Sequence, residues 1–360
     1  MIDLRSQFAR LELFVEDSRI LSSPMPAQTA IALHRQPESL SFTRIRRFGF
    51  ACLFLYVLGS LLGGIVLGWT ALHPKRNLLT SKEEHNVRMA SASESVVFRS
   101  IEVTASDGGT LRAWFLRPKD TNGDVVLLLH GVTDNRLGMY GYGQIMLRNH
   151  YSVLLPDARA HGNSGGELAT YGFKESDDIH HWVDWLQGEL HPRCVFGFGE
   201  SMGAAQILQS LTKESRFCAV AAESPFSSFR EVAYDRVGRA FHTGSWLGRS
   251  FFRPLIDTGF LFARLKYGID FEDVSPAHAV AASQVPVLLI HGMKDRNIPP
   301  RHSEYIQAGN TSHVVLWEVP GAVHTAAHNV QPKEFERRLL GWFAGHSVAE
   351  ESNSKNNVSQ

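Results

Sequence analysis

The sequence predicts an α/β fold in which a doubly wound, mostly parallel sheet is preceded by one membrane-spanning helix. Short, continuous apolar runs of strand length recur along the chain, as expected for strands that are covered on both faces. Stretches with helical periodicity alternate with these runs, which is typical of a parallel sheet with helices on both sides. A separate apolar run at 48–72 contains no charged residue and predicts the membrane helix.

The composition excludes several classes of protein. The 360 residues include 36 basic and 36 acidic side chains, and this balance gives no reason to expect a nucleic-acid partner. The three cysteines, Cys52, Cys194 and Cys218, are too few for a disulfide framework in a chain of this length. We expect all three to be buried as small apolar side chains. No spacing of cysteine and histidine is typical of a zinc site.

The N-terminal region divides into a tail and an apolar segment. Prolines interrupt residues 1–47, which we expect to form a flexible tail. The uncharged run at 48–72 exceeds the length of about 20 apolar residues that suffices to cross a bilayer. Within it, Gly64 and Gly68 have the small-residue spacing of a helix-pairing face. The alternatives are a buried helix of a soluble protein and a signal peptide, but the run is long, is followed by cations and lacks a convincing cleavage site.

The basic residues on the two sides of the apolar run predict its orientation. Within about 15 residues of the run, four arginines precede it and three lysines or arginines follow it. Cytoplasmic flanks of membrane helices carry an excess of such residues. This small excess predicts a cytoplasmic N-terminus and places the rest of the chain outside the cytoplasm.

The remainder of the chain has the pattern of one α/β domain. After a linker at 73–92 this domain occupies residues 93–346, and we expect the polar residues 347–360 to be disordered. Residues 225–284 contain many phenylalanines but no clear strand. Because a structureless insertion of this length is unusual in a compact domain, we expect helices that form a cap over the sheet. Strands are expected at 95–103, 110–116, 124–130, 151–156, 218–223, 285–291 and 313–319, with one more before residue 199.

The strand before residue 199 ends in a motif that is typical of catalytic serines. The apolar run that begins at Cys194 ends in Gly199-Glu200-Ser201-Met202-Gly203, and a helical pattern follows immediately. Gly-x-Ser-x-Gly between a strand and a helix is typical of a nucleophile elbow, which presents the serine on a sharp turn. The pentapeptide alone would also fit an ordinary strand-to-helix turn, so the remaining motifs decide between the two interpretations.

Four further motifs follow predicted strands in matching order. They are His130-Gly131-Val132, the loop from Asp157 to Ser164, His291-Gly292-Met293-Lys294-Asp295 and Pro320-Gly321-Ala322-Val323-His324. With the elbow, these motifs make residues 95–345 resemble a serine hydrolase of the α/β-hydrolase fold. Within that family the chain is similar to membrane-anchored ABHD-type and serine aminopeptidase-like hydrolases. The resemblance implies a catalytic triad in the chain order Ser…Asp…His.

The predicted site residues come from the ends of several strands. Ser201 needs a base, because a serine hydroxyl is a poor nucleophile at neutral pH. His324 follows the last apolar strand and is the predicted base, while Asp295 follows the preceding strand and is predicted to orient the imidazole. By position and by resemblance, the backbone N–H groups of Val132 and Met202 form the oxyanion hole.

Other residues could supply the same chemical groups. His130 and His291 end buried strands, where we expect them to form structural hydrogen bonds, and His161 is expected to shape its own loop. His328 lies four residues after His324 and is the alternative base. The alternatives to the predicted aspartate lie in the expected cap and are Asp270 and Asp273.

These residues predict a hydrolase that cleaves carboxylic esters through an acyl-Ser201 intermediate. The phenylalanine-rich cap and the membrane helix favour a small-molecule ester or a lipid-like substrate, although the phenylalanines could simply pack the cap onto the sheet. The same triad would also serve a peptidase or an acyltransferase. An alternative of another class is a catalytically silent scaffold held at a membrane. The predicted chemistry needs no metal or organic cofactor.

Overall fold

A computed structural model describes residues 42–347 of the chain. Two compact units are distinguished, residues 1–50 and residues 51–360. The described part of the first unit, residues 42–50, is the beginning of a helix. The tails that we expected at 1–47 and 347–360 lie outside the described residues, except for residues 42–47, which are helical, and residue 347.

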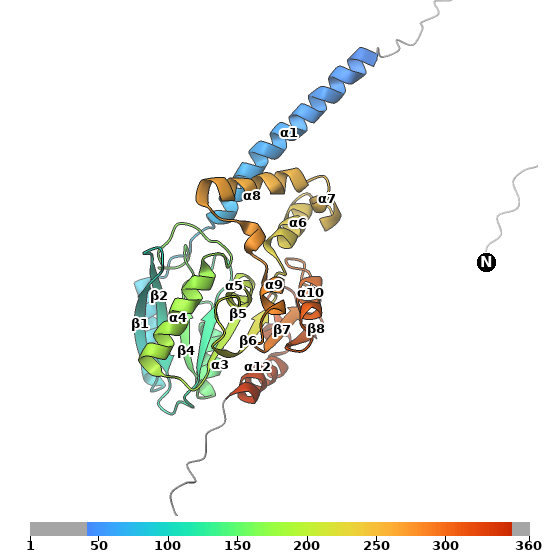
Figure 1. The fold of residues 1–360 in the computed structure, drawn as a ribbon. Coiled ribbons are helices and arrows are strands. Elements are labelled where there is room, and N and C mark those ends of the chain that lie inside the picture. The colour runs from blue at the N-terminus through green and yellow to red at the C-terminus, as the bar shows by residue number, and fades with distance from the viewer. Residues whose placement is uncertain (1–41, 348–360) are drawn as a thin grey trace, which may run out of the picture. The chain divides into compact units, whose positions relative to one another are not determined.

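The second unit contains an eight-stranded sheet with the order β1-β2-β4-β3-β5-β6-β7-β8 (Figure 1). β2 pairs with β1 and β4 in antiparallel fashion, and all the other neighbouring strands pair in parallel. The mostly parallel sheet predicted from the sequence is therefore confirmed. The strands are β1 Val97–Thr104, β2 Thr110–Arg117, β3 Val125–Leu129, β4 Ser152–Pro156, β5 Val195–Glu200, β6 Phe217–Glu223, β7 Val287–Gly292 and β8 Val314–Val319.

Helices cover both faces of the sheet, and this explains the continuous apolar runs. Successive side chains of a strand point to opposite faces. In β3, Leu127 and Leu129 join the core under α4, α5, α9 and α10, whereas Val126 and Leu128 join the core under α2, α3 and α12. The helices on the sheet are α2 Ser81–Ser93, α3 Tyr140–Arg148, α4 Glu175–Leu190, α5 Met202–Ser210, α9 Pro276–Ala281, α10 Arg301–Gly309, α11 Ala327–Val330 and α12 Pro332–His346.

The insertion between β6 and β7 is helical, as its lack of strand pattern predicted. Besides α9, it contains α6 Phe229–Ala240, α7 Ser245–Arg249, α8 Arg253–Tyr267 and the short 3-10 helix η1 Phe271–Asp273. Its phenylalanines form a cluster in which the rings of Phe229 and Phe271 stack with centroids 4.2 Å apart. Phe260 packs against both of these rings. We refer to α6, α7, α8 and η1 as the cap.

Helix α1 spans Phe42–Leu72 and begins earlier than the predicted residue 48. The basic residues that we assigned to a flexible tail continue the helix, because arginine is a favourable helix former. In the described residues α1 is the one helix that is long and apolar enough to cross a membrane. Phe54 and Leu62 are 66% and 58% exposed, which is not the burial expected of a core helix in a soluble protein.

One narrow face of α1 contacts the cap. The buried residues Ser60, Gly64, Gly68 and Leu72 recur every four positions and therefore lie along one side of the helix. A Cβ atom added to Gly64 would lie 2.5 Å from the Leu255 carbonyl oxygen of α8. The two helix backbones are thus in close contact, and the partner of the predicted helix-pairing face is α8 of the same chain.

The segment that we predicted as a linker, 73–92, contains most of helix α2. Its first turn is fixed by a capping box, in which the Thr80 side chain accepts a hydrogen bond from the Glu83 backbone N–H. The Glu83 carboxylate in turn accepts a bond from the Thr80 backbone N–H at 2.7 Å. Thr-x-x-Glu is a helix-start signal that the sequence contains and that our interpretation missed.

The prediction that all three cysteines are buried as small apolar side chains is wrong, because two of them form a disulfide and the third is exposed. Cys194 and Cys218 form a disulfide between the beginnings of the adjacent strands β5 and β6, with their Cα atoms 5.7 Å apart. Two cysteines at this separation on neighbouring strands have the geometry that a disulfide requires. Only the register of the two strands brings them together, and the sequence does not show this register. Cys52 is a free, exposed cysteine on α1.

Candidate active site

The predicted nucleophile lies on a strained turn between β5 and α5. Ser201 has φ +52° and ψ −111°, a conformation that costs a non-glycine residue about 1–3 kcal/mol. Its backbone N–H donates to the Glu223 carbonyl oxygen at 2.9 Å, which ties the turn to β6. A Cβ atom at Gly203 would lie 2.2 Å from the Leu129 carbonyl oxygen, so only glycine fits where the helix passes β3. The surrounding structure therefore holds the serine at the tip of a sharp turn.

Ser201, His324 and Asp295 form one hydrogen-bonded chain. The Nε2 atom of His324 lies 2.9 Å from the Ser201 Oγ, and its Nδ1 lies 2.6 Å from an Asp295 carboxylate oxygen. Because a carboxylate can only accept, Nδ1 carries the proton and donates to Asp295. Nε2 is then free to accept the serine proton. The structure thus brings together three residues that are distant in the sequence and that were predicted as a triad.

The carboxylate of Asp295 is held by backbone and imidazole groups. Its second oxygen accepts hydrogen bonds from the backbone N–H groups of Asn297 at 2.8 Å and Ile298 at 3.0 Å. Burial tends to raise the pKa of Asp295, but hydrogen bonding with His291 and His324 outweighs burial and holds this pKa well below its usual range. Asp295 is therefore ionised at neutral pH, as a group that stabilises an imidazolium must be.

The two predicted oxyanion donors both lie at the cavity that contains Ser201. Val132 follows β3 and Met202 begins α5, and both line the same cavity as the Ser201 side chain. Within residues 42–347 the backbone N–H of neither residue donates a hydrogen bond. The chain crosses to opposite sides of the sheet after β3 and β5, and ligands of α/β proteins bind at such a point. The arrangement is suited to binding an anionic oxygen beside Ser201.

The other histidines that we weighed have structural surroundings. The ring of His130 lies 2.7 Å from the Gly131 carbonyl oxygen and 3.1 Å from the Ala158 backbone nitrogen. The ring of His291 contacts the Ser303 hydroxyl and the Ile298 carbonyl oxygen. His161 is fully buried, and this burial lowers its pKa to about 4. These three residues support the loops around the site, as predicted.

The alternative base and the alternative aspartates are placed elsewhere. His328 lies 3.3 Å from Glu336 rather than beside the Ser201 hydroxyl. Asp270 caps η1 and faces Arg264 in the cap, and the side chain of Asp273 is exposed. None of them is hydrogen-bonded to Ser201 or His324.

A second serine–histidine–aspartate set occurs at the base of the cap. The Ser227 hydroxyl lies 2.8 Å from His302 Nδ1, and His302 Nε2 lies 2.9 Å from Asp235. The Ser227 backbone N–H also donates to the same Nδ1, at 3.1 Å. This nitrogen therefore already accepts from the backbone, and all three residues are buried. The set joins α6 to α10 and has no opening to the cavity of Ser201.

Two glutamates lie next to the nucleophile, the partly buried Glu200 and the fully buried Glu223. Burial and the neighbouring carboxylate of Glu223 raise the pKa of Glu200 to about 8. Burial also raises the pKa of Glu223 to about 7, although the backbone N–H of Ala327 donates to it at 2.9 Å. The last bond connects β6 to the segment that follows His324. Near neutral pH these groups are at least partly protonated, which reduces negative charge next to the site.

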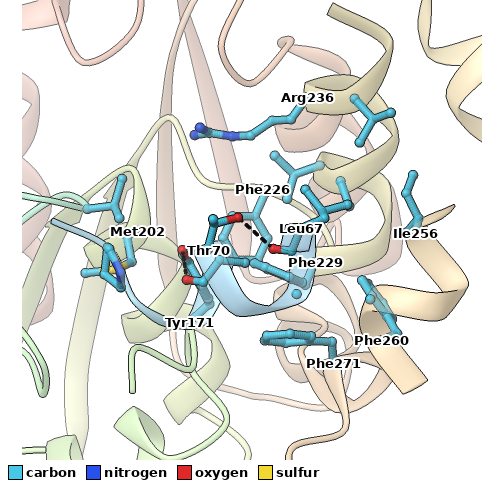
Figure 2. A pocket seen from close by; sticks show the side chains of 18 of the residues that line it. Leu67, Thr70, Tyr171, Met202, Phe226, Phe229, Arg236, Ile256, Phe260 and Phe271 are labelled. Carbon is cyan, nitrogen blue, oxygen red and sulfur yellow. Dashed lines mark hydrogen bonds between the residues drawn. The ribbon is translucent and has the colours of Figure 1, made fainter. Parts of the chain in front are cut away.

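The Ser201 side chain opens into a largely apolar cavity of about 350 Å³, which is within the range of small-molecule sites (Figure 2). Its walls come from α1, the loops after β3 and β5, and the cap. The lining residues are Leu67, Gly68, Thr70, Ala71, Pro74, Val132, Thr133, Tyr171, Ser201, Met202, Phe226, Phe229, Val232, Ala233, Arg236, Val237, Ile256, Gly259, Phe260, Phe271 and Ile298.

The contribution of α1 to this cavity was not predicted. The C-terminal end of α1 is bound to the α/β domain, since the Tyr171 hydroxyl donates to the Ala71 carbonyl oxygen at 2.8 Å and the Ala169 N–H donates to the Leu72 carbonyl oxygen at 2.9 Å. These bonds hold Leu67 and Thr70 against the cavity (Figure 2). No local sequence signal marks these residues, because their role depends on the packing of α1.

The described residues contain no group of three or more histidine, cysteine, aspartate or glutamate side chains that could hold a metal ion.

A profile of the alpha/beta hydrolase family matches residues 126–338, which is more than half of the chain. The chain therefore belongs to the alpha/beta hydrolase family. Membership in this family supports a hydrolase activity.

Individual relatives are more distant. An uncharacterized protein of Bacillus subtilis, YqkD, is 26% identical over 76% of this chain and 91% of its own length. YuxL of the same organism, described as an uncharacterized peptidase, is 23% identical over 68% of this chain and 38% of its own length. Among solved structures, the Pyrococcus furiosus esterase Pf2001 matches with a TM-score of 0.60 and 24% identity, covering 77% of this chain and all of the esterase. At this identity the likeness to a solved structure shows the fold alone.

Proposed function

We propose that the protein is a serine hydrolase that cleaves carboxylic esters with an apolar acyl group. The observation that carries this proposal is the hydrogen-bonded chain from Ser201 through His324 to Asp295, which ends at an apolar cavity. In enzymes that catalyse acyl transfer, a serine in such a chain is the nucleophile, the imidazole is its general base, and the carboxylate orients the imidazole. All three members of this hydrogen-bonded chain are present. This argues against a catalytically silent scaffold, because such a protein has usually lost one of the three groups.

The proposed reaction proceeds in two halves. The Ser201 Oγ attacks the ester carbonyl carbon while its proton moves to His324 Nε2, and Asp295 stabilises the imidazolium. The bond between the carbonyl carbon and the alcohol oxygen then breaks, and the proton passes from His324 to the leaving alcohol. In the second half, water loses a proton to His324 and attacks the acyl-Ser201 carbonyl. The carboxylic acid leaves, and the proton returns to the Ser201 Oγ.

The tetrahedral intermediates of both halves carry a negative oxygen. The backbone N–H groups of Val132 and Met202 are proposed to donate to it, because they lie at the cavity beside Ser201 and form no other hydrogen bond in the described residues. One such donor contributes about 3–4 kcal/mol to transition-state stabilisation.

The cavity favours an ester over a peptide. A peptidase that binds a free amino group would need an acidic residue in the pocket, and within residues 42–347 no aspartate or glutamate lines this cavity. The walls are mainly aliphatic and aromatic, which suits an acyl chain. A peptidase remains the second candidate, because the relative YuxL is described as a peptidase and the structure of an acylaminoacyl peptidase from Pyrococcus horikoshii has the same fold, with a TM-score of 0.54.

The ester assignment predicts a substrate profile. We expect the purified, detergent-solubilised protein to hydrolyse p-nitrophenyl esters and to leave aminoacyl p-nitroanilides essentially uncleaved. Lengthening the acyl chain from acetyl to octanoyl should raise kcat/KM about 10-fold or more, because each added methylene that is buried in the cavity contributes about 0.8 kcal/mol. Steady-state rates on both series measure this profile. Preferential cleavage of the amides would contradict the proposal and favour the peptidase.

We further propose that α1 spans a membrane with its N-terminus in the cytoplasm, so that the hydrolase domain lies outside. The length and apolar character of α1 support the span, and the Cys194–Cys218 disulfide supports the orientation, because disulfides persist in oxidising compartments. Protease added to intact cells that express the protein with a tag at each end should remove the C-terminal tag and spare the N-terminal one. Protection of the C-terminal tag would reverse the proposed orientation.

A further inference from the structure

The cavity-facing side of α6 carries one charged residue at an apolar position. Phe229, Val232, Ala233, Arg236 and Val237 all line the cavity, and their spacing is that of a single helix face. Four of the five are apolar, as expected for a helix face that covers a binding pocket. Among the described residues that line the cavity, Arg236 is the only one that carries a formal charge.

The guanidinium of Arg236 has no partner in the part of the chain that the structure describes. The other two arginines of α6 are bound: Arg230 pairs with Asp257 at 2.6 Å, and Arg239 donates to the Arg296 carbonyl oxygen at 2.6 Å. Arg236 is therefore not part of the ion-pair network of the cap. Its side chain is exposed, and it lines the cavity.

The Arg236 guanidinium is accessible from solvent and is only partly desolvated by the apolar side chains around it. This desolvation lowers its pKa, but an arginine remains protonated at any physiological pH. The carboxylate of Asp295 attracts the guanidinium through space but forms no hydrogen bond with it, and its oxygens accept instead from His324, Asn297 and Ile298. Because the guanidinium forms no hydrogen bond or ion pair in the described residues, it is available to a ligand with a negative group, and guanidinium binds phosphate or carboxylate with two parallel hydrogen bonds.

The charged and apolar parts of the cavity are separated in space. Figure 2 shows the Arg236 guanidinium at the margin of the pocket opposite the rings of Phe260 and Phe271. These rings belong to the phenylalanine cluster of the cap, in which Phe229 stacks on Phe271 and Phe260 packs against Phe271. A molecule that occupies the whole cavity would therefore have an anionic group at one end and an apolar chain at the other.

We propose that Arg236 binds an anionic group of the substrate, and that this hydrolase acts on amphiphilic esters that carry one apolar acyl chain and one phosphate or carboxylate. This inference rests on the proposed ester hydrolysis at Ser201 and adds the charge of the substrate. Arg236 acts as a specificity residue, because it contacts the substrate away from the reacting carbonyl.

Three esters with the same oleoyl chain test the inference. They are 1-oleoylglycerol 3-phosphate, the oleoyl ester of glyceric acid and neutral 1-oleoylglycerol, which distinguish phosphate, carboxylate and no charge. We expect kcat/KM to be about 10- to 100-fold higher for at least one anionic ester than for the neutral one, since a hydrogen-bonded charge contributes about 1.5–3 kcal/mol. The difference between the two anionic esters identifies the preferred group. Equal rates on all three would overturn the inference and leave ester hydrolysis in place.

Variants at two arginines of α6 assign the effect to one side chain. Arg236→Leu should lower kcat/KM for the preferred anionic ester about 10- to 100-fold more than for the neutral ester, through KM. Arg236→Lys should keep part of the preference, because lysine retains the charge without the planar fork. Arg239→Leu is the matched control and should keep the full preference. An equal loss on charged and neutral esters in Arg236→Leu would show a merely structural role.

A binding measurement separates this inference from the proposed catalysis. In a Ser201→Ala background, 1-oleoylglycerol 3-phosphate should raise the Tm of the full chain more than 1-oleoylglycerol does, and adding Arg236→Leu should abolish the difference. Binding without preference for the anionic amphiphile would overturn the role of Arg236 even if the wild-type protein hydrolyses esters. A preference for the anion without any hydrolysis would leave Arg236 assigned and overturn the catalytic proposal instead.

Discussion

Ser201→Ala is expected to lower ester hydrolysis by about six orders of magnitude in kcat and to abolish covalent labelling by a fluorophosphonate probe. The alanine removes the only atom that can form the acyl intermediate in the proposed mechanism. The oxyanion donors and the cavity would still bind the ester, so a residual acceleration of about 10³- to 10⁴-fold over water should remain. Gel-based labelling and single-turnover hydrolysis with a long-chain p-nitrophenyl ester measure the two effects.

The matched control for this variant is Ser227→Ala. Ser227 is also hydrogen-bonded to a histidine that contacts an aspartate, but this set is buried at the base of the cap. We expect Ser227→Ala to keep the labelling and to lose about 1 kcal/mol of stability from the missing hydrogen bond. Labelling that persists in Ser201→Ala and disappears in Ser227→Ala would show that the nucleophile is Ser227 and would contradict the role proposed for Ser201.

The geometry of the candidate site follows closely from the sequence, because its residues lie at the ends of parallel strands. The elbow is a local motif, and its two glycines and strained serine are properties of the turn itself. Asp295 and His324 follow neighbouring strands β7 and β8, and the carboxyl ends of parallel strands lie on one edge of a sheet. The chain order of the motifs was therefore enough to predict which side chains meet.

Features that depend on packing between distant segments could not be predicted. The Cys194–Cys218 disulfide depends on the register of β5 against β6, which is irregular near Val195 and Phe196. The contact of α1 with α8 depends on which face of α1 meets the cap. The same packing places part of α1 in the lining of the cavity. The sequence did not single out Arg236 for the same reason. Its proposed role in binding depends on its position in the cavity that α6 faces, and this position is set by packing.

Asp295→Asn is expected to lower kcat about 10⁴-fold while leaving the fold and the substrate affinity nearly unchanged. The carboxylate accepts the Nδ1 proton of His324 at 2.6 Å and so leaves Nε2 free to take the serine proton. An asparagine amide in the same place can donate to Nδ1 instead, which moves the imidazole proton to Nε2. In that tautomer the nitrogen that faces Ser201 can no longer act as a base.

Two controls make the result for Asp295→Asn specific. Asp273→Asn changes the other aspartate considered for this role, and because its side chain is exposed in the cap, we expect wild-type kcat. Fluorophosphonate labelling of Asp295→Asn should be slowed in proportion to kcat, since attack on the probe needs the same base. A loss confined to KM, or equal losses in Asp295→Asn and Asp273→Asn, would contradict the role of Asp295, because a residue that orients the base acts on the chemical step.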